Sequence, residues 1–157
     1  MKSACYIDTP VGPLTVETDA RAVKAIRFGR HADAPRFDPA DPSLPAVLRQ
    51  AVGELQRYFS GDLQRFTVPV DPAGTPFQRR VWRALQQIPY GATCSYGALA
   101  AAIGRPKACR AVGMANHRNP IPVLIPCHRV VGADGSLTGY AGGLAVKSFL
   151  LQLERRQ

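Results

Sequence analysis

The sequence changes character at residues 71–74, DPAG, and this change limits the chain to two differently built parts. Before it, β-prone runs are separated by the turn-forming stretches TPVGP and DARA, which predicts an antiparallel meander. After it, apolar residues recur at helical spacing. A chain of 157 residues can form one domain or two small ones. We expect two domains, residues 1–72 and 73–157. The β-prone runs are Cys5–Asp8, Leu14–Thr18 and Val23–Phe28.

The rest of the first part contains one predicted helix. Apolar residues from Leu44 to Phe59 recur every three or four positions, and Ser43 stands where an N-cap belongs. The stretch RFTVPV, residues 65–70, is predicted to return as a strand. None of these patterns points to chemistry, so the first part is interpreted as a small α/β scaffold.

The first half of the second part contains signals for three helices. Thr75, Pro76 and Gln78 form a capping box with proline at the first helical position. Ser95 is the expected N-cap of a short helix that Gly104 ends, and Pro106 is expected to begin another that runs to about Asn116. Two short helices joined by a glycine-containing turn are typical of a helix-turn-helix. An antiparallel helical hairpin inside any bundle is the alternative.

Two further elements are predicted near the end of the sequence. The stretch VVGADGSLTGYAGG predicts a hairpin that turns at Asp134–Gly135, the position of a wing. Residues 144–154 predict a last helix.

The excess of positive charge lies entirely in the second part. The net charge is +9, yet residues 1–75 carry nine basic and nine acidic side chains. Residues 76–157 carry eleven basic side chains against only Asp134 and Glu154. A solvated basic face would explain this, but such an imbalance favours a polyanion, with nucleic acid as the default partner. Lys107 and Arg110 lie among small residues of the predicted second helix, which suits contacts with phosphates.

A Cys-His-Arg cluster interrupts the apolar run PVLIPCHRVV, residues 122–131. Cysteine is common in cores, but histidine and arginine are costly to bury unless they are paired. Cys127, His128 and Glu154 fit the pattern of a nucleophile activated by a base that an acid orients. Adjacent residues on extended backbone point apart, so direct contact needs a turn or a bridging water. A buried, inert cysteine is the alternative.

Composition gives no sign of export, a membrane span or a metal site. No run approaches the roughly 18 apolar residues of a spanning helix, so we expect a soluble, cytoplasmic protein without membrane contact. The four cysteines are far apart and are expected as reduced thiols. Cys5 with His31 would be only half of a zinc site, so no metal is expected.

Residues 75–154 closely resemble the O6-alkylguanine-DNA alkyltransferases, also called methylated-DNA–protein-cysteine methyltransferases. The resemblance rests on VWRALQQIPYGATCSYGALAAAIGRP, RAVGMANHRNP, IPCHRVVG and LTGYAGGLAVKSFLLQLE, in that order. It implies a ribonuclease H-like α/β N-terminal domain, with a small antiparallel sheet plus a helix. A mainly α winged helix-turn-helix domain, which binds DNA and carries the active site, would follow.

The resemblance implies DNA repair by direct reversal. Cys127 matches the acceptor that takes the alkyl group from O6-alkylguanine, and O4-alkylthymine would react less well. The thioether product has nothing to hydrolyse it, so the protein is spent after one turnover and needs no cofactor. His128 matches the base that acts through a water, and Glu154 the acid that orients it. Asn119 matches the residue linked to that water, and Tyr96 the phenol that protonates the departing guanine.

The resemblance also implies how DNA is bound. The lesion lies in double-stranded DNA, and its nucleotide must be flipped out of the duplex to reach a buried thiol. Arg110 matches the finger that fills the gap in the stack, with the second helix in the minor groove. A monomer is expected, with cooperativity on DNA left open. The other matched residues are Lys107, Ala108, Ser95 and Arg118 as DNA contacts, Pro122, Val130, Tyr140 and Ala141 as pocket walls, and Gly142 and Gly143 as room for the alkyl group.

Two other interpretations remain. A winged-helix regulator without chemistry explains the basic half, but it gives no reason for the Cys-His-Arg cluster or for Glu154. A cysteine hydrolase would form a thioester that hydrolyses, so it predicts multiple turnover and indifference to DNA.

Overall fold

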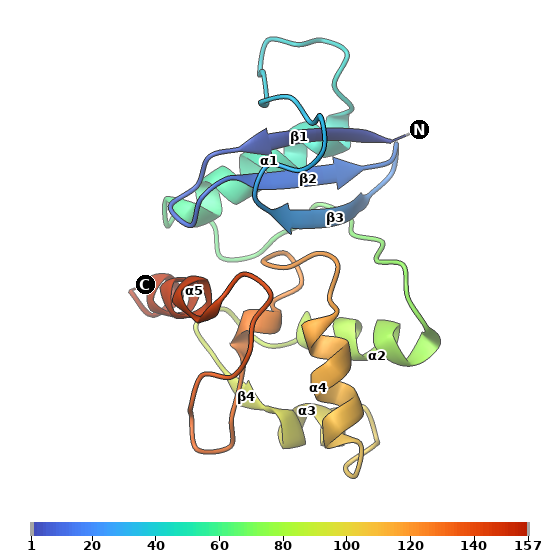
Figure 1. The fold of residues 1–157 in the computed structure, drawn as a ribbon, viewed down its shortest axis with the longest axis vertical. Coiled ribbons are helices and arrows are strands. Elements are labelled where there is room, and N and C mark those ends of the chain that lie inside the picture. Colours follow the sequence, from blue (N-terminus) through green and yellow to red (C-terminus); the bar gives the residue numbers. More distant parts are fainter. Residues whose placement is uncertain (1, 157) are drawn as a thin grey trace. The chain divides into compact units, whose positions relative to one another are not determined.

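The computed structural model describes residues 2–156, and its first element is a three-stranded antiparallel sheet (Figure 1). The strands are β1 (Ser3–Ile7), β2 (Leu14–Thr18) and β3 (Val23–Phe28), in the order β1-β2-β3. The predicted meander is confirmed, with the first strand beginning two residues earlier than expected. Cys5 pairs with Val16, which in turn pairs with Ile26, so one buried row crosses the sheet.

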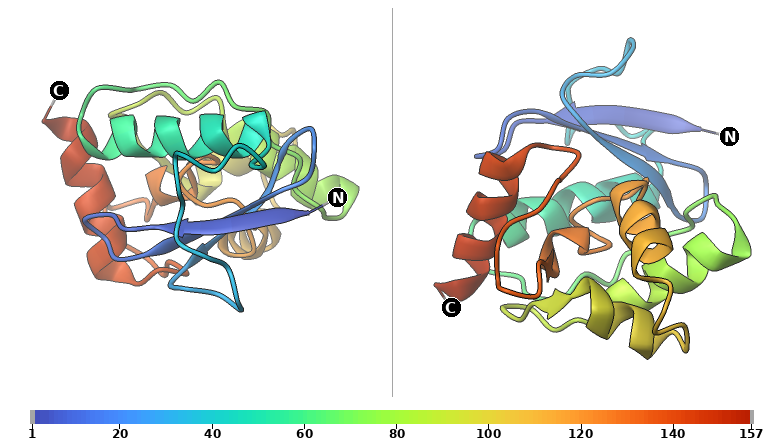
Figure 2. Two further views of the ribbon diagram at one scale, coloured as in Figure 1. Left: turned by 90° about the horizontal axis from the view of Figure 1, so that it is seen from above. Right: turned by 60° about the horizontal axis from the view of Figure 1, so that its bottom comes forward.

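Helix α1 (Ala46–Phe59) covers one face of this sheet (Figures 1 and 2). Its apolar stripe is buried, as its spacing predicts. The prediction of Ser43 as N-cap is wrong, because the helix begins at Ala46 with Pro45 at the N-cap position, and the Ser43 hydroxyl donates to Asp41 Oδ1 at 2.7 Å. The helix begins after Pro45, whose carbonyl accepts from the backbone N–H groups of Leu48 and Arg49.

The strand predicted for residues 65–70 is also wrong. Only an isolated parallel bridge joins Val70 to Val23. The backbone N–H groups of Thr67 and Val68 donate to the buried carboxylate of Glu54, at 2.9 and 3.1 Å. A side chain therefore takes the donors that a sheet ladder needs, and Pro69 has none to give.

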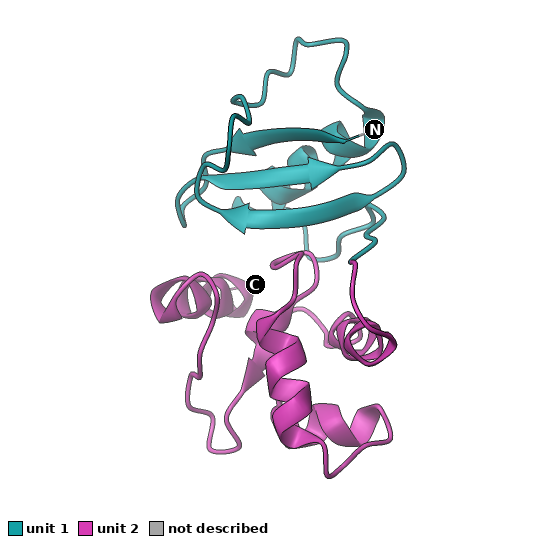
Figure 3. Cartoon of the chain, turned by 45° about the vertical axis from the view of Figure 1, so that its right-hand side comes forward, with its two compact units in different colours: residues 1–72 teal, residues 73–157 magenta. Residues whose placement is uncertain are grey.

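The chain divides into two compact units, residues 1–72 and 73–157 (Figure 3). The second unit holds four α-helices, one 3-10 turn and a short parallel pair of strands. Trp82 Nε1 donates to the carbonyl of Ala115 at 2.8 Å, which ties α2 to α4. The elements are α2 (Pro76–Leu85), β4 (Cys94–Ser95), α3 (Tyr96–Ala102), α4 (Cys109–His117), η1 (Cys127–Arg129), β5 (Val130–Val131) and α5 (Leu144–Arg155).

Local capping signals are confirmed at two helices and fail at a third. Thr75 and Gln78 form the complete capping box of α2, and Ser95 Oγ accepts from Ala98 N at the start of α3. Pro106, however, does not begin α4. The backbone between the two helices makes a turn in which Ala108 N donates to Arg105 O, so the helix starts at Cys109.

The predicted wing hairpin has its turn but not its second strand. Gly132 N donates to Ser136 O and Gly135 N to Gly132 O, which closes the turn at Asp134–Gly135. Residues 136–140 form no strand. The Thr138 carbonyl accepts from a lysine side chain instead of a strand neighbour. Among residues 2–156, no helix is both long enough and apolar enough to span a membrane.

Candidate active site

The segment before Cys127 is a buried loop that Asn119 holds closed. Asn119 Nδ2 donates to Ile125 O at 2.8 Å, and its Oδ1 accepts from Ile121 N at 2.9 Å. Val123 has φ of 74°, the left-handed region that a β-branched residue rarely adopts. The amide of Asn119 thus satisfies backbone groups inside a loop that has no strand partner.

Cys127 lies at the first position of the single turn η1. Its backbone N–H donates to Ile125 O at 2.8 Å, and its carbonyl accepts from the buried Asn116 Nδ2 at 3.4 Å. The sequence required a turn or a bridging water for Cys127 and His128 to cooperate, and a turn is present. The thiol is 5% exposed, so its surroundings rather than solvent control its chemistry.

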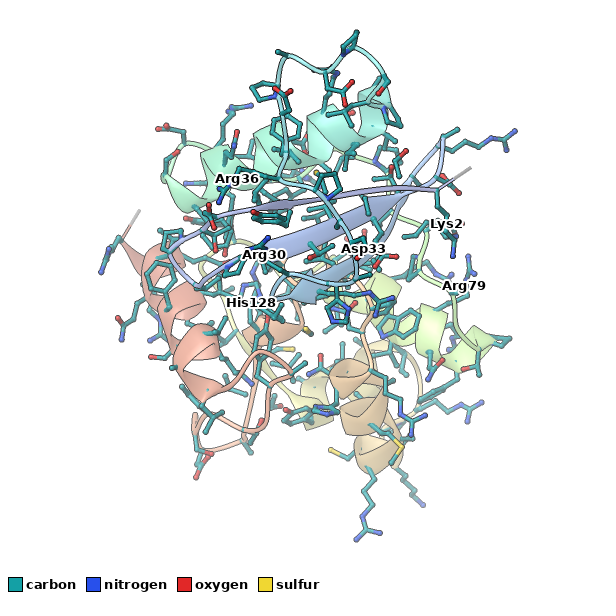
Figure 4. The ribbon with its side chains drawn as sticks, turned by 45° about the horizontal axis from the view of Figure 1, so that its top comes forward. Lys2, Arg30, Asp33, Arg36, Arg79 and His128 are labelled. Carbon is teal, nitrogen blue, oxygen red and sulfur yellow. The ribbon has the colours of Figure 1, made fainter. Side chains whose placement is uncertain are left out.

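One carboxylate binds both of the residues that follow Cys127 in the sequence. His128 Nε2 lies 2.7 Å from Glu154 Oε2. Arg129 donates to both oxygens of Glu154, from Nε at 2.8 Å and from Nη2 at 3.0 Å. Its Nη1 donates to Ile88 O at 2.7 Å. All three side chains are buried. The turn η1, which contains His128 (labelled in Figure 4), packs against α5.

This pairing defines which imidazole nitrogen is available as a base. Glu154 is acceptor-only as a carboxylate, so Nε2 of His128 carries the proton of their hydrogen bond. Nδ1 then holds a lone pair, and it is buried with no hydrogen-bond partner among the described residues. Burial lowers the pKa of His128 below its ordinary value, against the opposing pull of Glu154. The imidazole is therefore neutral at physiological pH.

The Cys127 thiol is protonated at rest. Burial raises its pKa to about 11, although Asn119, the charge of Lys147 and the phenol of Tyr140 each pull it down. Since the thiolate is the nucleophile, a base must take the proton when the thiol reacts. The free Nδ1 of the neighbouring His128 suits that task.

A buried lysine completes the polar cluster. Lys147 on α5 is 0% exposed and donates to Val130 O at 2.6 Å and to Thr138 O at 3.2 Å. Burial lowers the pKa of Lys147, while a thiolate at Cys127 would raise it. Tyr140 is also buried, and burial raises its phenol pKa. Lys147 and Tyr140, which both follow Cys127 in the sequence, thus influence the pKa of its thiol.

Tyr96 occupies the first position of α3. Its Oη lies 2.5 Å from the hydroxyl of Thr138. No hydrogen bond joins Tyr96 to Cys127 within residues 2–156. The predicted proton donor is therefore connected to the turn that bears the thiol through Thr138 and Lys147.

The predicted DNA contacts gather around α4. Arg110 and Lys107 are exposed at its beginning, Ala108 is its N-cap, and Arg118 is exposed at its end. Figure 1 places α3 beside α4. Ser95 is half-buried, and its oxygen already caps α3.

The predicted pocket residues fall into two groups. Pro122, Val130 and Tyr140 are buried, and the phenol of Tyr140 helps to lower the pKa of the Cys127 thiol. Ala141 is exposed and Gly142 half-buried, and no described contact joins either to Cys127. The first group is thus buried within the second unit, and the second group lies nearer its surface.

Sequence reasoning missed Asn116, Lys147 and Thr138. Lys147 carried a usable signal: with Leu150, Leu151 and Glu154 it falls on one helical face at three- and four-residue spacing. A lysine on an apolar face is costly to bury and therefore marks a polar partner. Asn116 and Thr138 gave no comparable signal.

All four cysteines are free thiols. Within the described part of the chain, no three His, Cys, Asp or Glu side chains gather as metal ligands.

An α/β unit followed by a helix-turn-helix unit with a buried Cys-His-Glu arrangement defines a class: DNA-binding proteins that carry a nucleophilic cysteine. Comparison with known families matches residues 76–156 to the 6-O-methylguanine DNA methyltransferase DNA binding domain. Residues 4–72 match the ribonuclease-like domain of the same proteins. The chain belongs to the 6-O-methylguanine DNA methyltransferase family.

Individual relatives agree over nearly the whole chain. The methylated-DNA–protein-cysteine methyltransferase of Methanosarcina acetivorans is 46% identical over 147 residues, 94% of each chain. That of Mycobacterium tuberculosis H37Rv is 48% identical, covering 95% of this chain and 90% of its own. A crystal structure of Mycobacterium tuberculosis OGT in complex with DNA aligns with a TM-score of 0.87 at 44% identity, covering 98% of this chain and 93% of that one. The predicted family and fold class are confirmed.

Proposed function

We propose that this protein repairs DNA by direct reversal: it transfers the alkyl group of O6-alkylguanine to Cys127 and is spent after one turnover. The observation that carries the proposal is the hydrogen bond between His128 and Glu154, which leaves Nδ1 as a buried base on the residue that directly follows Cys127. Family membership supplies the substrate class.

The transfer is one displacement at carbon. The Cys127 proton passes to His128 Nδ1 through a water, and Glu154 holds Nε2–H while the imidazole becomes charged. The Sγ–C bond forms as the C–O6 bond breaks. The electron pair of the C–O6 bond goes to the guanine, which takes the phenol proton of Tyr96. Asn119 keeps the preceding loop in place. No group in the site can hydrolyse the thioether, and no cofactor is needed.

The DNA is double-stranded, and α4 binds it through the minor groove. Arg110 fills the gap that the flipped nucleotide leaves, while Lys107 and Arg118 contact phosphates. Ala108 and Ser95 lie at the two helix starts, where small side chains allow the backbone to approach closely. The second unit, residues 73–157, is thus the DNA-binding and active-site domain, and residues 1–72 are a scaffold.

The flipped base enters a pocket walled by Pro122, Val130, Tyr140 and Ala141, with Gly142 leaving room for the alkyl group. O4-alkylthymine is a poorer substrate. The protein acts as a monomer, in the cytoplasm, where thiols stay reduced.

Mass spectrometry tests the proposal directly. The protein is incubated with a duplex oligonucleotide containing one O6-methylguanine, and the intact protein and its peptides are weighed. We expect one added methyl group per molecule, on the Cys127 peptide, and none in Cys127→Ser. The matched control Cys109→Ser removes the exposed thiol of α4 and retains the transfer.

An unmodified protein that still binds the lesion duplex would instead identify a lesion-sensing module. Repeated turnover, with the alkyl group released to water, would identify a hydrolase.

A further inference from the structure

The loop between β5 and α5 bonds to the phenol of Tyr96 through one hydroxyl. Thr138 Oγ1 lies 2.5 Å from Tyr96 Oη, across 42 residues of sequence. Both side chains are half-buried, so the contact is shielded from much of the solvent. A threonine hydroxyl can donate one hydrogen bond and accept others, and so can a phenol.

The backbone of Thr138 is itself fixed. The fully buried ammonium of Lys147 donates to the carbonyls of Thr138 and Val130. Val130 directly follows the turn that bears Cys127. The ammonium of Lys147 therefore links the backbone of Thr138 to the backbone just after the turn that bears the thiol, through one hydrogen bond to each.

We propose that Thr138 is a positioning residue for Tyr96, donating its hydroxyl proton to Oη so that the phenol O–H is left for the guanine. This inference rests on the proposed function. Oη carries a single proton, and a phenol that gives it to Thr138 has none for the leaving group. Donation from Thr138 leaves that proton free, and Lys147 holds the donor in place.

The hydrogen bond also matters during the reaction. As the Sγ–C bond forms and the C–O6 bond breaks, the electron pair goes to the guanine and the phenol proton follows it. Negative charge then develops on Oη, and the Thr138 hydroxyl already points at that atom. A donor arranged before the charge appears stabilises it without further reorganisation. The phenolate later regains a proton from water.

Three substitutions at one position test this role. Thr138→Val keeps the shape of the side chain but replaces the hydroxyl with a methyl group. Thr138→Ala removes both the hydroxyl and the methyl group of threonine. Thr138→Ser keeps the hydroxyl and removes only the methyl group. Single-turnover transfer from saturating O6-methylguanine duplex should slow about tenfold in Thr138→Val and Thr138→Ala, the effect of losing one hydrogen bond to a developing charge. Thr138→Ser should keep the wild-type rate constant. The duplex concentration at half-saturation should not change.

A double-mutant cycle separates positioning from general damage to the site. In a Tyr96→Phe background there is no phenol to position, so Thr138→Val should slow the transfer no further. Methylation of Cys127 by iodomethane, followed at its peptide, is the second readout. Iodide leaves without a proton, so every Thr138 variant should react like the wild type.

Each contrary result has a distinct meaning. Thr138→Val with the wild-type transfer rate, or with the same loss in the Tyr96→Phe background, would overturn the role of Thr138 alone. Slower reaction with iodomethane would show that Thr138 shapes the thiol site, which also overturns it. A wild-type protein that reacts with iodomethane but takes no methyl group from the duplex would overturn the proposed function and this inference together.

Discussion

Nε2 of His128 and Oε2 of Glu154 lie 2.7 Å apart, in a place where neither side chain is more than 1% exposed. The same carboxylate accepts two hydrogen bonds from Arg129, and a third group, Gly91 N, donates to it at 3.2 Å. Gly91 has φ of 80°, so a residue with a side chain would be strained at this contact. Glu154 thus binds His128, the proposed base, and also holds α5 to other parts of the second unit through Arg129 and Gly91.

Removal of this charge should destabilise the fold as well as slow the transfer. Glu154→Gln leaves the buried guanidinium of Arg129 without a counter-charge, and breaking a buried pair in this way costs about 3–5 kcal/mol. The urea midpoint should fall accordingly. The control is Asp8→Asn, which removes the carboxylate of an exposed pair with Arg36 and should lower the midpoint far less. Equal losses in the two variants would contradict the prediction.

The pH dependence of transfer should reflect the lowered pKa of His128. A protonated imidazole cannot accept the thiol proton, so the rate constant falls on the acid side. Because burial lowers the folded-state pKa below the ordinary 6.5, the rate constant should hold as the pH drops through 6.5 and decline only below it. Single-turnover rates at saturating duplex measure this. His31→Gln, in the other unit, should not move the midpoint, and a midpoint above 6.5 would refute the assignment.

Arg110→Ala should affect duplex far more than single-stranded substrate. A finger that fills the gap of a flipped nucleotide has no work to do where the lesion base is already unstacked. We expect a large loss of transfer from a duplex and a small one from a single strand. Lys107 is the proposed phosphate contact nearby, so Lys107→Ala should weaken transfer from both substrates and reduce the salt dependence by about one unit. If the two variants behave alike, Arg110 is a phosphate contact.

Gly74→Ala should destabilise the second unit. A Cβ at this position would lie 2.5 Å from Cη2 of Trp82. The indole cannot give way easily, since it is buried and its Nε1 donates to Ala115 O. Such overpacking costs about 1–3 kcal/mol, which denaturant unfolding would detect.

The matched control for that substitution lies in α1. A Cβ at Gly53 meets nothing within 4 Å, and the residue is inside a helix. Gly53→Ala should therefore raise the free energy of unfolding by about 0.5–1 kcal/mol. A similar gain from Gly74→Ala would show that the Trp82 contact is loose.

Local chemistry explains where sequence reasoning succeeded. The capping box of Thr75 and Gln78 spans three residues and needs nothing else from the chain, so it could be recognised directly. At Ser43 the same reasoning failed because the helix begins only at Ala46, with Pro45 at the N-cap position. The strand predicted for residues 65–70 failed because Glu54, eleven or more residues away, takes the backbone donors.

The candidate site divides in the same way. The proximity of Cys127 and His128, and the pattern that adds Glu154 to them, follow from the sequence, and the resemblance supplies the role of each residue. The bond from Thr138 to Tyr96 links residues 42 apart, and the bond from Asn116 to Cys127 depends on a buried loop. Neither has a periodicity or spacing that a sequence displays, because each is fixed by tertiary packing.

The position of Glu154 on α5 has a consequence for the order of synthesis. A ribosome adds Cys127 and His128 before it adds the carboxylate that orients the imidazole, and the groups from Lys147 onward also come later. Before α5 has emerged and packed, the imidazole of His128 lacks the carboxylate to which it is hydrogen-bonded in the folded protein. The arrangement that the proposed transfer requires is therefore completed only when α5 packs against the turn η1.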